Sequence, residues 1–82
     1  MSDRKRVTLR QMPAGRSGKV VEIQGGMGLV NRLSALGLRS GKKITKVSSM
    51  LMRGPVTVQL GNTRLAIGFG MAERIIVELD EA

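Results

Sequence analysis

The 82-residue chain contains no cysteine and no histidine. Without cysteine, neither a disulfide framework nor a thiolate metal site can form. The commonest general base and the best nucleophile at neutral pH are missing as well. The six methionines could offer thioethers to copper(I), but scattered methionines are more often core residues. The sequence therefore predicts a protein that is not an enzyme and has no cofactor, no catalytic residue and no metal ligand set.

Aromatic residues are almost absent, since Phe69 is the only one. The core must then be built from valine, isoleucine, leucine and methionine. Proteins that bind single-stranded nucleic acid stack the bases on aromatic side chains, at about 1–3 kcal/mol per base. One phenylalanine cannot make such a platform, whereas contact with duplex phosphates remains an open alternative.

Long hydrophobic runs are missing too. The longest unbroken apolar stretches are three residues, such as Met50-Leu51-Met52, against the roughly 20 residues of a membrane-spanning helix. The first six residues are mostly charged, and no apolar run of signal-peptide length follows them. We therefore expect a soluble, cytoplasmic protein that is peripheral to a membrane at most.

Acidic residues are few in most of the chain. Residues 1–64 carry 13 Lys and Arg against Asp3 and Glu22, which gives +11. Residues 65–82 carry Arg74 against four carboxylates, which gives −3. The basic majority would attract a polyanion, whether nucleic acid, anionic lipid or an acidic protein face. Charge alone does not decide among these three.

Short strands separated by glycine dominate the pattern. Alternating or β-branched runs predict strands at 18–24, 43–47, 56–60, 63–67 and 75–79, while 7–15 is predicted as a loop. Apolar residues at 29, 30, 33 and 36 predict one short helix, which Gly37 would end, with Leu38 adding an apolar contact. The glycines at 25, 26 and 28 lack the Lys and Thr of a phosphate loop and are predicted only to turn the chain. Five strands with a helix between the first two predict a mainly β, strongly bent antiparallel barrel.

The connection between the second and third predicted strands is unusually apolar. It carries Met50, Leu51 and Met52, followed by Arg53. Connections normally run over the surface and are polar. Two alternatives follow with equal weight: an exposed docking patch, or a plug in which Leu51 closes the end of the barrel.

Several segments resemble the FeoA-like family, whose members are small cytosolic accessory proteins of bacterial ferrous-iron uptake. The run Arg32-Leu33-Ser34-Ala35-Leu36-Gly37-Leu38 matches the family pattern R-L-x-x-L-G-L-x-P-G, which ends here at Gly41 with Ser40 in place of the proline. The segment 15–20 and the closing segments 65–67 and 72–77 are similar as well. The resemblance implies an SH3-like barrel over residues 8–79, between a basic tail (1–7) and an acidic tail (80–82). It also implies a non-enzymatic role on the membrane ferrous-iron transporter, which carries a cytosolic GTPase domain.

The resulting hypothesis is an adaptor whose partner is a protein. We expect its contact face to include Leu36, Leu38 and residues 50–53 (Met50, Leu51, Met52 and Arg53). Lys42, Lys43 and Lys46 would steer the association electrostatically. The first alternative is a small basic barrel that binds nucleic acid, and the second is a regulatory module that binds a transition metal.

Overall fold

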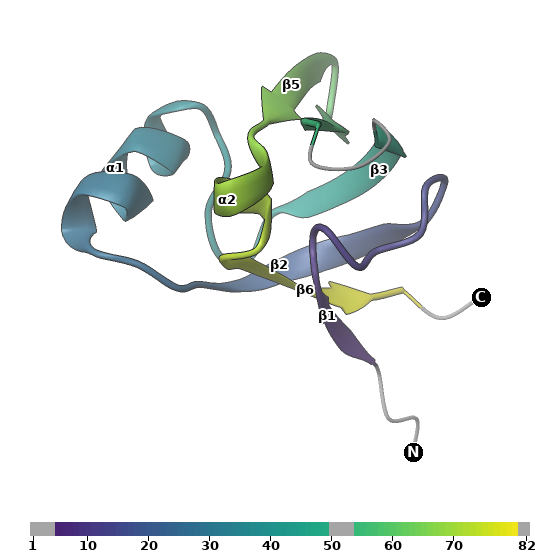
Figure 1. Cartoon of the computed structure of the whole chain (residues 1–82), viewed down its shortest axis with the longest axis horizontal. Helices are drawn as coiled ribbons and strands as arrows, with labels where there is room; N and C mark the ends of the chain where they lie inside the picture. The colour runs from purple at the N-terminus through teal and green to yellow at the C-terminus, as the bar shows by residue number, and fades with distance from the viewer. Residues whose placement is uncertain (1–4, 50–53, 81–82) are drawn as a thin grey trace.

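A computed structural model describes residues 5–49 and 54–80 of the chain (Figure 1). These residues form one antiparallel sheet of six strands, in the order β1-β6-β2-β3-β4-β5. The strands are β1 (Arg6–Thr8), β2 (Ser17–Ile23), β3 (Lys43–Ser49), β4 (Val56–Leu60), β5 (Thr63–Ile67) and β6 (Ile75–Leu79). Helix α1 (Met27–Ala35) lies between β2 and β3, and the single turn α2 (Phe69–Ala72) lies between β5 and β6.

The sheet bends around a single aliphatic core. The register shifts at Val20/Glu22 between β2 and β6 and at Lys46/Ser48 between β3 and β4, and such bulges increase the local twist. Alternate residues of the strands point inward, so that Ile75, Val77 and Leu79 of β6 are all buried. Among the described residues, the largest fully buried side chains are aliphatic or methionine, as the composition predicts: Leu9, Met12, Val20, Leu33, Leu38, Ile44, Val58, Ile67, Ile75 and Val77.

The predicted mainly β class and the helix between the first two predicted strands are confirmed. The strand count was wrong by one, because residues 7–15, predicted as a loop, begin inside β1. This three-residue strand pairs with β6, with Val7 opposite Val77. Among the described strands it pairs with β6 alone, about 70 residues further along the chain, so no local sequence pattern predicts it. The predicted hairpin at 61–62 is confirmed by the pairing of Leu60 with Thr63.

Helix α1 ends as its sequence predicts. Gly37 has φ +92°, a conformation that suits glycine. Its N–H donates to the Ser34 carbonyl at 2.9 Å, and the Leu38 N–H donates to the Leu33 carbonyl at 2.9 Å. Leu33 and Leu38 are both buried, which supplies the apolar contact of this cap. The cap turns the chain toward β3 and leaves α1 projecting from the sheet (Figure 1).

Neither helix in the described part of the chain is long and apolar enough to cross a membrane.

Candidate functional site: a pocket between α1 and the β4–β5 hairpin

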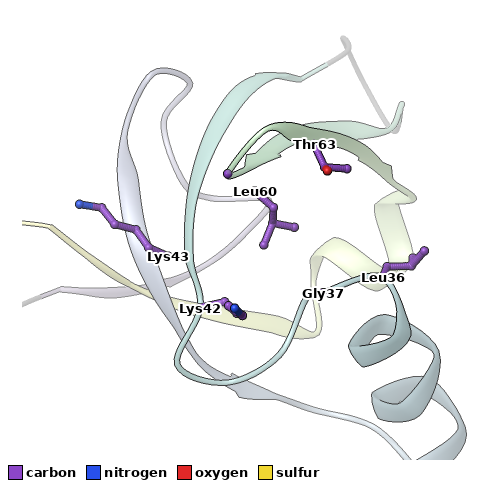
Figure 2. Close-up of a pocket in the computed structure, with 7 residues that line it drawn as sticks. Leu36, Gly37, Lys42, Lys43, Leu60 and Thr63 are labelled. Atoms are coloured by element: carbon purple, nitrogen blue, oxygen red, sulfur yellow. The ribbon is translucent and has the colours of Figure 1, made fainter.

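A surface pocket of about 390 Å³ lies between the end of α1 and the β4–β5 hairpin (Figure 2). Three segments that are distant in sequence supply its lining: the cap of α1, the start of β3, and the turn of the hairpin. The lining residues are Leu36, Gly37, Lys42, Lys43, Leu60, Gly61 and Thr63.

The pocket combines apolar and cationic side chains. Leu60 is half-buried and projects between the hairpin and the cap of α1, while Leu36 stands at the other side and is 51% exposed (Figure 2). Lys42 and Lys43 lie on the side formed by β3. No lining residue is acidic, and the whole stretch between Glu22 and Glu73 contains no carboxylate side chain. Such a site suits a protein surface that offers an apolar side chain flanked by carboxylates.

The two lysines differ in what they can offer a partner. Lys43 Nζ lies 2.9 Å from Asp80 Oδ2, and in Figure 2 its side chain points away from the pocket. Lys42 is exposed and has no carboxylate of residues 5–49 or 54–80 within ion-pair distance. Lys42 therefore carries the charge that is available at the rim.

The structure brings together three of the residues predicted from the sequence. Leu36, Lys42 and Lys43 are exposed and line the same pocket. Their role in binding stays a prediction. The four residues Met50, Leu51, Met52 and Arg53 lie outside the described residues.

The prediction for Leu38 was wrong. Its exposed fraction is 0%, so it cannot contact a partner. The cap at Gly37 reverses the chain direction and directs Leu38 into the core beside Leu33. Consecutive leucines on either side of a cap glycine thus face opposite environments, with Leu36 outside and Leu38 inside.

The surface role predicted for Lys46 was also wrong, because this side chain is only 2% exposed. It lies on the same side of β3 as the buried Ile44, as the two-residue period of a strand requires. Its Nζ donates to the Arg10 carbonyl at 3.0 Å and to the Met12 carbonyl at 2.5 Å. Burial, and secondarily the charge of Arg10, lowers the pKa of Lys46 below its ordinary value of 10.5. Lys46 therefore fixes the loop after β1 from within.

Sequence reasoning missed Leu60 and Thr63. Leu60 has the same parity as the buried Val56 and Val58, which indicates an inward position. It lies at the end of β4, where the core gives way to the pocket, so it is only half-buried. The alternation of buried residues along β4 predicts that Leu60 points inward. It does not predict where the core ends, because contacts between distant segments decide that.

Two alternatives, a transition-metal site and the binding of single-stranded nucleic acid, have little support in the described residues. Residues 5–49 and 54–80 contain no cluster of three His, Cys, Asp or Glu side chains that could hold a metal ion. The only aromatic ring, Phe69, has the Arg10 guanidinium carbon 4.8 Å from its centre. This contact occupies one face of the ring on which a base would stack.

The six-stranded, strongly bent antiparallel sheet around one aliphatic core defines a small β domain of the SH3-like class. Residues 7–79 match the FeoA domain, and the chain belongs to the FeoA domain family. The resemblance deduced from the sequence is thereby confirmed.

Three relatives show how closely the chain follows this family. A provisionally named Fe(2+) transport protein A of Methanocaldococcus jannaschii is 34% identical over 59 residues, 72% of this chain and 70% of that protein. The crystal structure of an iron uptake regulatory protein (FeoA) is 37% identical with a TM-score of 0.85, over 93% of this chain and all of that one. A zinc complex of Stenotrophomonas maltophilia FeoA is 29% identical with a TM-score of 0.74, over 88% and 89% of the two chains. That last protein is described as an SH3 domain protein and a candidate activating factor of ferrous-iron transport.

Proposed function

We propose that this protein is a non-enzymatic accessory factor of ferrous-iron uptake. In this role it acts in the cytoplasm and binds the membrane ferrous-iron transporter through the cytosolic GTPase region of that transporter. Family membership and the names of the relatives support the link to iron transport. The observation that carries a binding role is the pocket, in which apolar and basic side chains meet without any acidic one.

The pocket suggests how such a partner would be held. An apolar side chain of the partner would pack against Leu60 and Leu36, and a neighbouring carboxylate would pair with Lys42. Desolvated apolar anchors supply most of the binding energy in protein interfaces, while rim charges mainly raise the association rate. Binding would shift the conformational equilibrium of the transporter only if the adaptor binds one conformation of the transporter more tightly than another.

The direct test is an amide NMR titration of this protein with the isolated GTPase domain of its cognate transporter. We expect saturable shifts in two separate segments, 36–43 and 60–63, because the pocket joins them. An absence of shifts at high concentration of the domain would contradict the proposal. Binding of duplex DNA instead, with an affinity that falls steeply with salt, would favour the nucleic-acid alternative.

Two exposed substitutions sharpen this test. Leu36→Asp should weaken binding about tenfold or more, because it places a charge at an apolar anchor. Lys42→Glu should weaken it by a similar factor at low salt and by less at high salt. Both side chains are exposed, so the far-UV circular dichroism should not change. The matched control is Lys19→Glu on β2, which makes the same charge change outside the pocket lining. An equal loss in the control would show that net charge, not the pocket, holds the partner.

A further inference from the structure

The excursion from β2 to β3, residues 24–42, carries basic residues and no acidic ones. Its basic residues are Arg32, Arg39 and Lys42. The acidic partners of basic residues lie elsewhere: Glu78 pairs with Arg6 at 3.4 Å, and Asp80 pairs with Lys43. In Figure 1, α1 projects on one side of the molecule, and β1 lies on the other side. The excursion is therefore a basic projection.

This projection also exposes apolar side chains. Met27 is 74% exposed and Leu36 is 51% exposed, and these are the large hydrophobic residues that stand exposed in the described part of the chain. Met27 is the first residue of α1, and Leu36 is its C-cap. Isolated exposed leucines or methionines are common, but here both belong to one short helix, in a segment with three basic residues and no acidic one.

Helical geometry places one of these residues on a defined surface. With 3.6 residues per turn, Met27, Asn31 and Ala35 follow one another along the helix, and Gly28 and Arg32 lie beside them. All five are exposed, whereas Leu33 on the opposite side is buried. We call these five residues the α1 surface. Apart from Met27 and Arg32 its side chains are small and uncharged, so a flat partner can approach the helix closely.

We propose that the α1 surface, together with Arg39, docks onto an anionic lipid bilayer, with Met27 inserted among the lipids and the arginines at the headgroups. A bilayer accepts a convex projection with a single apolar side chain, whereas a protein partner would have to provide a matching cavity. The start of α1 adds to the attraction, because its first turn has no acidic residue and no side-chain cap. Amphipathic helices bind at the bilayer interface by this combination of apolar burial and basic charge.

Vesicle sedimentation tests the proposal. The full protein is mixed with vesicles of phosphatidylcholine alone or with 30% phosphatidylglycerol. Each Lys or Arg near an anionic surface strengthens binding about fivefold, so Arg32 and Arg39 together predict a preference of roughly twenty-five-fold. Met27→Gln and Arg32→Gln should each weaken binding to the anionic vesicles about fivefold. The matched control Lys19→Gln, on β2, should have a much smaller effect. Neither Met27 nor Arg32 lines the pocket, so these variants leave the proposed protein contact intact.

A fluorescence measurement supplies a second readout. The chain contains no tryptophan and no tyrosine, so Met27→Trp introduces a single reporter. Its emission should shift to the blue with anionic vesicles and be quenched by brominated lipid, whereas that of Lys19→Trp should not. No binding to anionic vesicles would overturn the proposal. So would equal losses in Arg32→Gln and Lys19→Gln with no effect of Met27→Gln. The vesicles contain no protein and the NMR titration contains no lipid, so either proposal can fail without the other.

Discussion

Replacing Lys46 with methionine is expected to lower the free energy of unfolding by about 2–4 kcal/mol. The substitution keeps most of the side-chain volume but removes the two hydrogen bonds to the Arg10 and Met12 carbonyls. Hydrogen bonds from a charged donor contribute about 1.5–3 kcal/mol, and a buried acceptor left without a donor costs about 1–3 kcal/mol. The total stability of a small domain is about 5–15 kcal/mol, so the loss should be evident in urea denaturation.

The control for this substitution is Lys42→Met, which makes the same chemical change at an exposed position. Its free energy of unfolding should stay within about 0.5 kcal/mol of the wild type. Replacing a buried charge by an apolar side chain is sometimes stabilising, because the charge no longer has to be desolvated. A Lys46→Met protein as stable as the wild type would mean that desolvation outweighs the two hydrogen bonds.

The pH dependence of stability provides a separate check on Lys46. The pKa of Lys46 is lowered below 10.5 in the folded protein, first by burial and then by Arg10. Between the folded pKa and 10.5, the unfolded chain binds more protons than the folded one, so unfolding becomes less favourable as the pH rises. The wild type should gain stability relative to Lys46→Met through this alkaline window, measured by urea denaturation at successive pH values. If the difference in free energy of unfolding between the wild type and Lys46→Met moved in favour of Lys46→Met as the pH rises, the stated direction of the Lys46 pKa shift would be contradicted.

Lys46 also shows what the sequence alone could not resolve. The charge of a lysine predicts a surface position, whereas the strand period places it with Ile44 on the inner side. The carbonyl groups that accept its hydrogen bonds are more than 30 residues away. Sequence patterns report the local period well but do not report such distant acceptors. Charge alone therefore predicts the wrong position for Lys46.

The same difference between local and long-range information applies to the rest of the fold and to the pocket. Features that depend on neighbouring residues were predicted correctly: the strand runs bounded by glycine, and the cap at Gly37. Features that need distant segments were missed, namely β1 and the contribution of Leu60 to the pocket. The sequence predicted Leu36 at the contact face but did not predict that the β4–β5 hairpin lies opposite it. A family resemblance supplies the global arrangement, but it does not say which side chains of this chain face solvent.

Gly18→Ala is the second substitution with a large expected effect on stability. Gly18 lies in the middle of the sheet, paired with Ile44 of β3 and Leu79 of β6. A Cβ atom at this position would lie 2.5 Å from Val77 Cγ1 and 2.6 Å from the Glu78 carbonyl oxygen. The valine side chain could rotate, but the carbonyl belongs to the neighbouring strand and can move only with it. Overpacking of this kind costs about 1–3 kcal/mol, and the backbone contact favours the upper end of that range.

The consequence of Gly18→Ala should extend to the pocket, because the same strand holds the segment that carries Lys42. Two residues along β2, the Val20 N–H donates to the Lys42 carbonyl at 2.8 Å, and the Val20 carbonyl accepts from the Gly41 N–H at 2.7 Å. The matched control is Gly28→Ala, where an added Cβ meets nothing within 4 Å and where alanine favours the helix by about 0.8–1 kcal/mol. In thermal unfolding, Gly18→Ala should therefore have a lower Tm than the wild type, and Gly28→Ala a higher one. Equal stability of Gly18→Ala and wild type would mean that β2 and β6 can separate at this point without cost. In that case the pocket would not depend on their close approach.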